Sequence, residues 1–134
     1  MKLVVIESPL AGDFARNQRY ARLCSIDCLR RGESPYASHL FFTQMLDDRN
    51  SEERNLGIEA GYEWARSADI FAFYTDLCVS NGMLQALKKW ERLVQFDIPM
   101  STQKKDRIQY RELPPDLLAL LDSDEPLKAT PGAA

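Results

Sequence analysis

The chain has few of the residues that build metal centres and disulfide scaffolds. It contains three cysteines, Cys24, Cys28 and Cys78, without a C-x-x-C pair, and its one histidine is His39. An odd number of cysteines without paired spacing argues against a disulfide framework and favours a reducing compartment. Because no other ligand cluster accompanies them, Cys24 and Cys28 are interpreted as buried core thiols rather than as half of a metal site. We expect no metal and no cofactor.

A basic excess and a long apolar run are also missing. The 134 residues include 17 Lys plus Arg and 20 Asp plus Glu, which gives a net charge of −3. This balance excludes a broad footprint for a nucleic-acid polymer. No apolar stretch approaches the roughly 20 residues that cross a bilayer, and the first residues do not form a secretory signal. We therefore expect a cytoplasmic protein without a membrane partner.

The apolar residues that are present alternate between two spacings along the chain. Continuous apolar runs and alternating segments predict strands at 3–6, 70–74, 98–100 and 107–113, and a strand followed by its exit loop over 35–42. Helical spacing predicts helices at 14–31, 51–67, 82–96 and 114–121. This order predicts an α/β fold, an open, mostly parallel, doubly wound sheet of about five strands with helices on both faces, of the flavodoxin or Rossmann kind. We expect one domain over residues 1–122 and a disordered tail over 123–134.

Two loops are predicted to lie at the carboxyl end of this sheet. Residues 8–13 follow the first strand, residues 76–82 follow the third, and each loop runs into a helix. Open parallel sheets bind ligands at this end, at the topological switch point, and helix N-termini favour phosphate or carboxylate. Neither loop matches G-x-G-x-x-G or G-x-x-x-x-G-K-[ST]. A phosphorylated small molecule is the functional interpretation, and two ordinary strand-to-helix turns are the alternative.

Several short motifs occur in a fixed order along the chain. They are I-E-S-P-L-A-G-D at 6–13, Asn17, G-E-S-P-Y-A-S-H at 32–39 and S-N-G-M at 80–83. In order and spacing, over about residues 2–100, they resemble the nucleoside 2-deoxyribosyltransferase-like family, in particular its small phage and bacterial members, which are related to nucleoside-monophosphate N-glycosidases. The resemblance implies the α/β fold and a nucleotide-like ligand more firmly than it implies a reaction.

The reaction that the resemblance implies is cleavage of an N-glycosidic bond by a glutamate in a motif of the form S-x-G-M-x-x-E. Here the glutamate position is occupied by Ala86, which cannot attack or accept a proton. Three explanations stay open: a natural relative that binds without cleaving, an engineered Glu-to-Ala variant, or service by another carboxylate. For the last, the candidates are Glu59, Glu63 and Asp76.

Three functions follow as hypotheses, and whether the chain is an enzyme stays open. The first is a nucleotide- or nucleoside-binding protein that is catalytically silent because of Ala86. The second is an N-glycosidase or deoxyribosyltransferase acting on a (deoxy)nucleoside monophosphate. The third is a phage protein that sequesters a nucleotide defence signal.

The candidate site combines catalytic and ligand-binding positions. Ala86 and Asp76 are the catalytic positions. The ligand-binding candidates are Ser8, Pro9, Gly12, Asp13, Asn17, His39, Ser80, Asn81, Gly82 and Met83. The alternatives are structural, with Asp13 and Ser80 or Asn81 as helix caps. The expected partners are a small nucleotide-like molecule and further copies of the chain, in a dimer or larger homo-oligomer formed through Trp90, Leu93 and Phe96.

Overall fold

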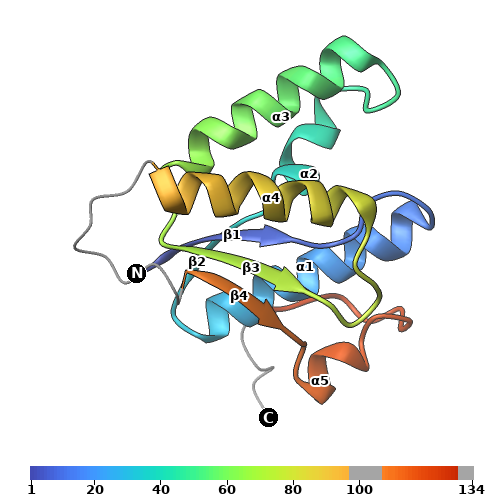
Figure 1. Ribbon diagram of the computed structural model, residues 1–134. Coiled ribbons are helices and arrows are strands. Elements are labelled where there is room, and N and C mark those ends of the chain that lie inside the picture. Colours follow the sequence, from blue (N-terminus) through green and yellow to red (C-terminus); the bar gives the residue numbers. More distant parts are fainter. Residues whose placement is uncertain (97–106, 130–134) are drawn as a thin grey trace.

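Four parallel strands form the central sheet of the computed structural model, which describes residues 1–96 and 107–129 (Figure 1). They are β1 (Leu3–Glu7), β2 (Ser34–Tyr36), β3 (Ile70–Tyr74) and β4 (Ile108–Arg111). Across the sheet they lie in the order β2-β1-β3-β4. Val5 of β1 is opposite Tyr36 on one side and Phe71 on the other. The predicted α/β class and parallel sheet are confirmed, with four strands among the described residues rather than about five. The strand predicted at 98–100 lies outside the described residues.

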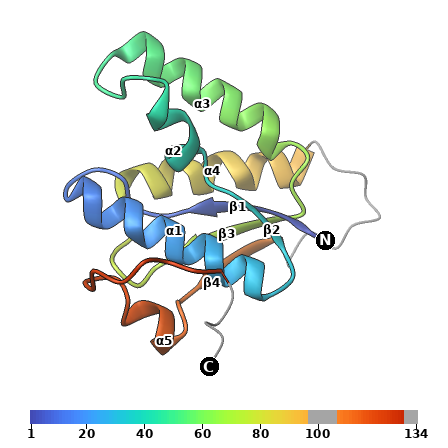
Figure 2. The ribbon, with the colours of Figure 1, turned by 180° about the vertical axis from the view of Figure 1, so that it is seen from behind.

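The helices cover both faces of this sheet, as a doubly wound fold requires. They are α1 (Phe14–Arg30), α2 (Ser38–Phe41), the 3₁₀ helix η1 (Phe42–Gln44), α3 (Ser51–Ala65), α4 (Asn81–Phe96) and α5 (Pro115–Leu118). Figures 1 and 2 show α1 and α5 on one face and α4 on the other, with α3 beside α4 and farther from the sheet. The sheet is thus buried on both sides.

Alternation along each strand divides the core into two clusters. Val4 and Ile6 point to the α1 side, where they pack with residues such as Cys24, whereas Val5 points to the α4 side and packs with Phe71 and Trp90. Successive strand residues face opposite sides, so a strand covered on both faces is a continuous apolar run. Cys24 and Cys28 are buried and unpaired, which confirms their interpretation as core thiols, and Cys78 is exposed.

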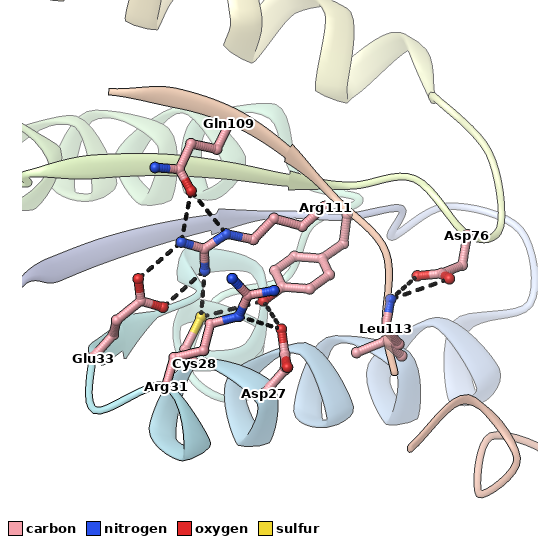
Figure 3. Close-up of polar contacts among 9 residues, drawn as sticks. Asp27, Cys28, Arg31, Glu33, Asp76, Gln109, Arg111 and Leu113 are labelled. Carbon is pink, nitrogen blue, oxygen red and sulfur yellow. Dashed lines mark hydrogen bonds and ion pairs between the residues drawn. The ribbon is translucent and has the colours of Figure 1, made fainter. Parts of the chain in front are cut away.

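A polar network is buried on the α1 side of the sheet (Figure 3). We call Asp27, Arg31, Glu33, Tyr74 and Arg111 the α1-side network. Arg111 donates to both carboxylate oxygens of Glu33 at 2.8 Å, and these side chains are only 5% and 12% exposed. The Tyr74 hydroxyl donates to Asp27 at 2.7 Å, and Arg31 donates to the same oxygen at 3.0 Å. Burial acts to raise the pKa of Glu33, but its hydrogen bonds and ion pair with Arg111 lower it overall.

The segment after β2 differs from its prediction. A strand and its exit loop are predicted over 35–42; the strand is present and ends at Tyr36, but residues 38–44 form α2 and η1 rather than an open loop. Leu40 packs against the α1-side core, and the Thr43 hydroxyl donates to the His39 carbonyl at 2.7 Å. These contacts are available to a helical turn and not to an extended strand. The prediction of an exit loop was wrong because a short apolar stretch does not by itself exclude a helical turn.

The chain stays packed beyond residue 122, where the sequence predicts a disordered tail. Arg19 of α1 donates to the carbonyls of Leu120 at 2.9 Å and Glu125 at 2.7 Å, and Leu127 packs against the α1-side core. The ordered domain therefore extends through this segment. Residues 130–134 lie outside the described part.

Candidate functional site

A cavity of about 440 Å³ lies at the carboxyl end of the sheet. Its walls come from the end of β1 and the loop after it, from α2 and η1, from α3, and from the first turn of α4. This is the end of the sheet toward which the strand arrows point in Figure 1. The chain leaves β1 toward β2 on one side, whereas β3 lies on the other, so the switch point of the sheet is between β1 and β3. The cavity opens where this topology predicts a ligand site.

Two glycines on α3 allow one wall of the cavity to form. A side chain at Gly61 would place its Cβ 3.1 Å from the Cβ of Ser38, and one at Gly57 would place it 3.2 Å from Leu46. The absence of side chains lets α3 approach α2 and η1 closely. Gly57 itself lines the cavity, as does Phe42, so this close approach shapes the space available to a ligand.

Ser8 and His39 meet inside the cavity from two different elements. The Ser8 hydroxyl and Nε2 of His39 share a hydrogen bond of 2.7 Å. Burial lowers the pKa of His39 to about 4, so the imidazole is neutral at neutral pH. A neutral imidazole and a hydroxyl can each donate and accept a hydrogen bond, which suits contact with a hydroxyl or phosphate oxygen. The structure brings these two predicted residues together.

Glu7, the last residue of β1, also lines the cavity. Its Oε1 accepts a hydrogen bond of 3.0 Å from Nε1 of Trp90. Burial raises the pKa of Glu7 to about 7, although the Trp90 hydrogen bond and the charge of Lys89 act to lower it. A carboxyl group with such a pKa can hold or release a proton near neutral pH, as acid–base groups in functional sites do.

The first turn of α4 contributes four predicted residues to the cavity wall, Ser80, Asn81, Gly82 and Met83. Ser80 caps the helix, because its hydroxyl accepts from the backbone N–H of Met83 at 3.2 Å. The structural and functional interpretations of Ser80 therefore coexist. A side chain at Gly82 would meet only the Ser80 hydroxyl, at 3.8 Å, so the helix start is open toward a ligand.

Charged side chains from the start of α3 and the loop before it complete the rim. Asp48, Glu53 and Arg54 line the cavity, and Nε of Arg54 lies 4.0 Å from Asp48. Both partners of this pair are more than half exposed, so the interaction is weak and Arg54 is available to an anionic ligand.

Four predicted binding residues support the loop after β1 and do not line the cavity. Asn17 donates to the carbonyls of Leu10 at 3.1 Å and Ala11 at 2.9 Å, and the latter two residues do line it. Asp13 caps α1 by accepting from Arg16 N at 3.2 Å. Gly12 has a φ of 102°, which favours glycine. Pro9 is buried and also lies off the cavity wall.

Ala86 packs on the α4-side core and is not part of the cavity wall. The carboxylates suggested as substitutes are not on the wall either. Asp76 accepts a hydrogen bond from the Tyr20 hydroxyl at 2.5 Å and one from Leu113 N at 3.0 Å, which ties α1 to the segment after β4. Figure 3 shows the contact with Leu113. Glu59 and Glu63 are exposed on α3. We therefore assign Asp76 to the framework rather than to catalysis.

The sequence interpretation missed Glu7 as a site residue. Its identity as a carboxylate directly after three buried apolar residues, Val4 to Ile6, was the available signal. The rim residues Glu53 and Arg54 were missed as well, because nothing local to them indicates which way the start of α3 faces.

The described residues offer neither a metal-ligand cluster nor a helix that could span a membrane. Within residues 1–96 and 107–129, no group of three or more His, Cys, Asp or Glu side chains is placed to hold a metal ion. In the same residues, no helix combines the length and apolarity that crossing a membrane requires.

A family model described as a domain of unknown function (DUF7768) matches residues 2–98, which include every wall of the cavity. A search of the curated proteins finds no match to the chain.

Proposed function

Because the chain belongs to the DUF7768 domain family, whose function is unknown, we propose a function from the cavity itself: the protein binds a small nucleotide-like molecule there. The observation that carries the proposal is the meeting of β1, α2, η1, α3 and α4 around one cavity at the switch point of a parallel sheet. Such positions bind nucleotides and other phosphorylated ligands in many open α/β sheets.

The cavity offers separate contacts for the parts of such a ligand. Backbone N–H groups in the first turn of α4 have no partner within the helix and favour a phosphate, and Arg54 can add a positive charge. Ser8 and His39 can bind sugar hydroxyls, and Phe42 offers a ring against which a base can pack. A net charge of −3 does not oppose this, since the phosphate would be held locally.

In this proposal the ligand is bound and not cleaved, because Ala86 occupies the position of the expected nucleophile and has no group that can attack a sugar. Tight binding of this kind is also what sequestration of a nucleotide signal would require. Cleavage of an N-glycosidic bond is the second candidate, and the presence of Glu7 in the cavity favours it. Release of free base from deoxynucleoside monophosphates, by the natural chain and by Ala86→Glu, separates the two candidates.

Calorimetry with nucleoside monophosphates, the matching nucleosides, ADP-ribose and cyclic nucleotides tests binding directly. We expect a nucleotide to bind and Arg54→Ala to weaken it at least about tenfold, with a smaller effect on the unphosphorylated nucleoside. Arg92→Ala, which removes an exposed arginine of α4, is the matched control and should leave affinity unchanged. If no member of the panel binds, the proposed function is wrong.

Self-association stays a prediction, but on a different surface. Trp90 and Leu93 are buried in the core, at 5% and 3% exposure, so the face expected to form the interface is not available, although Phe96 is exposed. Exposed apolar side chains lie instead on α3, at Leu56 and Trp64. We expect light scattering to give a mass above 15.3 kDa and Leu56→Glu to lower it. A monomer mass for the natural chain would contradict this.

A further inference from the structure

Glu7 differs from the buried carboxylates Asp27 and Glu33, each of which forms an ion pair with an arginine. Trp90 Nε1, a neutral donor, gives it its hydrogen bond at 3.0 Å. Among the described residues, no nitrogen of Lys, Arg or His lies within 4.0 Å of it as an ion-pair partner. A buried carboxyl group without a cation holds its proton more strongly than one in water.

The charged groups around Glu7 come from every element that packs on the cavity. On α4, Lys89 lies with its Nζ 5.8 Å from the centre of the Trp90 ring and acts to lower the pKa of Glu7. The start of α3 contributes Glu53 and Arg54, and the loop before it contributes Asp48. The α2 helix contributes His39, whose lowered pKa keeps it neutral. None of these cations offsets burial, which raises the pKa of Glu7 to about 7.

Glu7 also faces the turn of α4 that carries Ala86. Met83 lines the cavity together with Glu7, and Trp90 binds the Glu7 carboxylate. Ala86 lies between them on the same core-facing side of α4, since residues three and four apart share a helix face. Through Trp90, Glu7 therefore contacts the same face of α4 from which a glutamate at position 86 would project.

We propose that Glu7 is the functional carboxylate of this cavity, which contacts the bound ligand and donates a hydrogen bond to an acceptor atom of it. This inference rests on the proposed function, because it assumes a ligand in the cavity. The acceptor is an uncharged atom, such as a ring nitrogen or carbonyl oxygen of a base. A carboxyl group can donate only while it is protonated, so the ligand binds the protonated form.

Proton linkage gives this contact a defined signature. Binding should weaken as the pH rises through about 7, the pKa of Glu7, and should fall about tenfold per pH unit above it. In Glu7→Gln the amide donates a hydrogen bond at every pH. This variant should keep the affinity that the natural chain has at low pH and lose the pH dependence.

The proton on Glu7 can be observed without any ligand, because Trp90 binds the carboxylate. In a Trp64→Phe background, which removes the exposed indole, tryptophan fluorescence should titrate near pH 7, and Glu7→Gln should abolish this transition. Ala86→Glu should shift the transition upward, since a like charge would face Glu7. Leu84→Glu, which adds the same charge on the exposed side of α4, is the matched control and should not shift it.

The ligand experiment is calorimetry at about pH 6 and about pH 8 with AMP, GMP, CMP and UMP, their deoxy forms and ADP-ribose. We expect the ratio of the affinity at the lower pH to that at the higher pH to be larger for the natural chain than for Glu7→Gln. Titration of a ligand phosphate, whose second pKa is about 6, is common to both proteins and cancels in this comparison. If a nucleotide binds and both proteins show the same affinity and pH dependence, the contact by Glu7 is wrong and the proposed function stands. If no compound binds at either pH, the proposed function and the contact both fail, whatever the fluorescence shows.

Discussion

The carboxylates Glu33 and Glu7, on the two faces of the sheet, differ in the groups that hydrogen-bond them. In the α1-side network, Glu33 pairs with Arg111 through two bonds of 2.8 Å, whereas Glu7 on the α4 side receives one bond from a neutral indole. The pKa of Glu33 is lowered overall and that of Glu7 is raised to about 7. A fully paired network stabilises the fold, whereas an unpaired acid beside a cavity is retained at a cost in stability, which is typical of a functional site.

The largest effect is expected when the paired side loses its cation. Arg111→Met removes the ion pair and both hydrogen bonds that Arg111 gives the buried Glu33 carboxylate, and we expect a loss of about 3–5 kcal/mol in the free energy of unfolding. Urea unfolding at neutral pH measures it. The double variant Arg111→Met with Glu33→Leu should lose less than the single variant, because no charge is then left unpaired.

The exposed pair of Arg30 with Asp116 is the matched control. Its side chains are 29% and 65% exposed at a distance of 2.7 Å, so Arg30→Met should cost at most about 1 kcal/mol. Equal losses for the two arginines would mean that burial of the Arg111 pair has no special weight, and the contrast between the faces would fail.

The second prediction concerns pH and the unpaired acid. Glu7 has a pKa of about 7 when folded against an ordinary value of 4.5, so the stability that its protonation contributes is present below pH 4.5 and lost as the pH rises to 7. We expect Glu7→Gln to match the natural chain below that range and to exceed it by up to about 3 kcal/mol above pH 7. Urea unfolding across this pH range measures the difference.

In the natural chain, His39 should offset the change in unfolding free energy with pH that Glu7 causes. Its pKa falls from 6.5 to about 4 on folding, so its contribution is present above pH 6.5 and lost as the pH falls to 4. The effects of Glu7 and His39 oppose each other between these limits. Relative to the natural chain, His39→Asn should gain stability on acidification, and Glu7→Gln should lose it. Parallel curves for all three proteins would contradict both pKa shifts.

The sequence predicts the fold better than the site because the fold depends on local patterns. Val4 to Ile6 and Ile70 to Tyr74 are short, continuous apolar runs of the kind found in strands buried on both faces, and the position of the cavity follows from their order. Ser8, His39 and the start of α4 were therefore predicted at the correct end of the sheet. Whether they bind a ligand is a separate question, which the experiments above address.

The role of Glu7 could not be predicted in this way, because it depends on contacts between distant segments. Its partner Trp90 is 83 residues away along the chain, and the burial that raises its pKa requires α4 to be in place. Asp76 shows the converse. It follows a buried strand like a site residue, but Tyr20 and Leu113 hold it in the framework. Spacing alone does not distinguish these two carboxylates.

A smaller effect is expected when the paired side loses a hydroxyl. Tyr74→Phe removes the 2.7 Å hydrogen bond to Asp27, whose carboxylate is buried and keeps its hydrogen bond from Arg31. A buried acceptor that loses a donor costs about 1–3 kcal/mol. Urea unfolding measures the loss, and Tyr110→Phe, an exposed tyrosine of β4, is the control and should change little.

The smallest effect is expected for the same kind of change on the cavity side. Ser8→Ala removes the 2.7 Å hydrogen bond to His39, but His39 lines the cavity, where water can take the place of the hydroxyl. We expect less than about 1 kcal/mol in unfolding free energy, and a much larger proportional loss in affinity for any nucleotide that binds. A residue that matters more to affinity than to stability belongs to the site, whereas Tyr74→Phe should show the reverse. A loss of stability as large as that of Tyr74→Phe, with affinity unchanged, would place Ser8 in the framework instead.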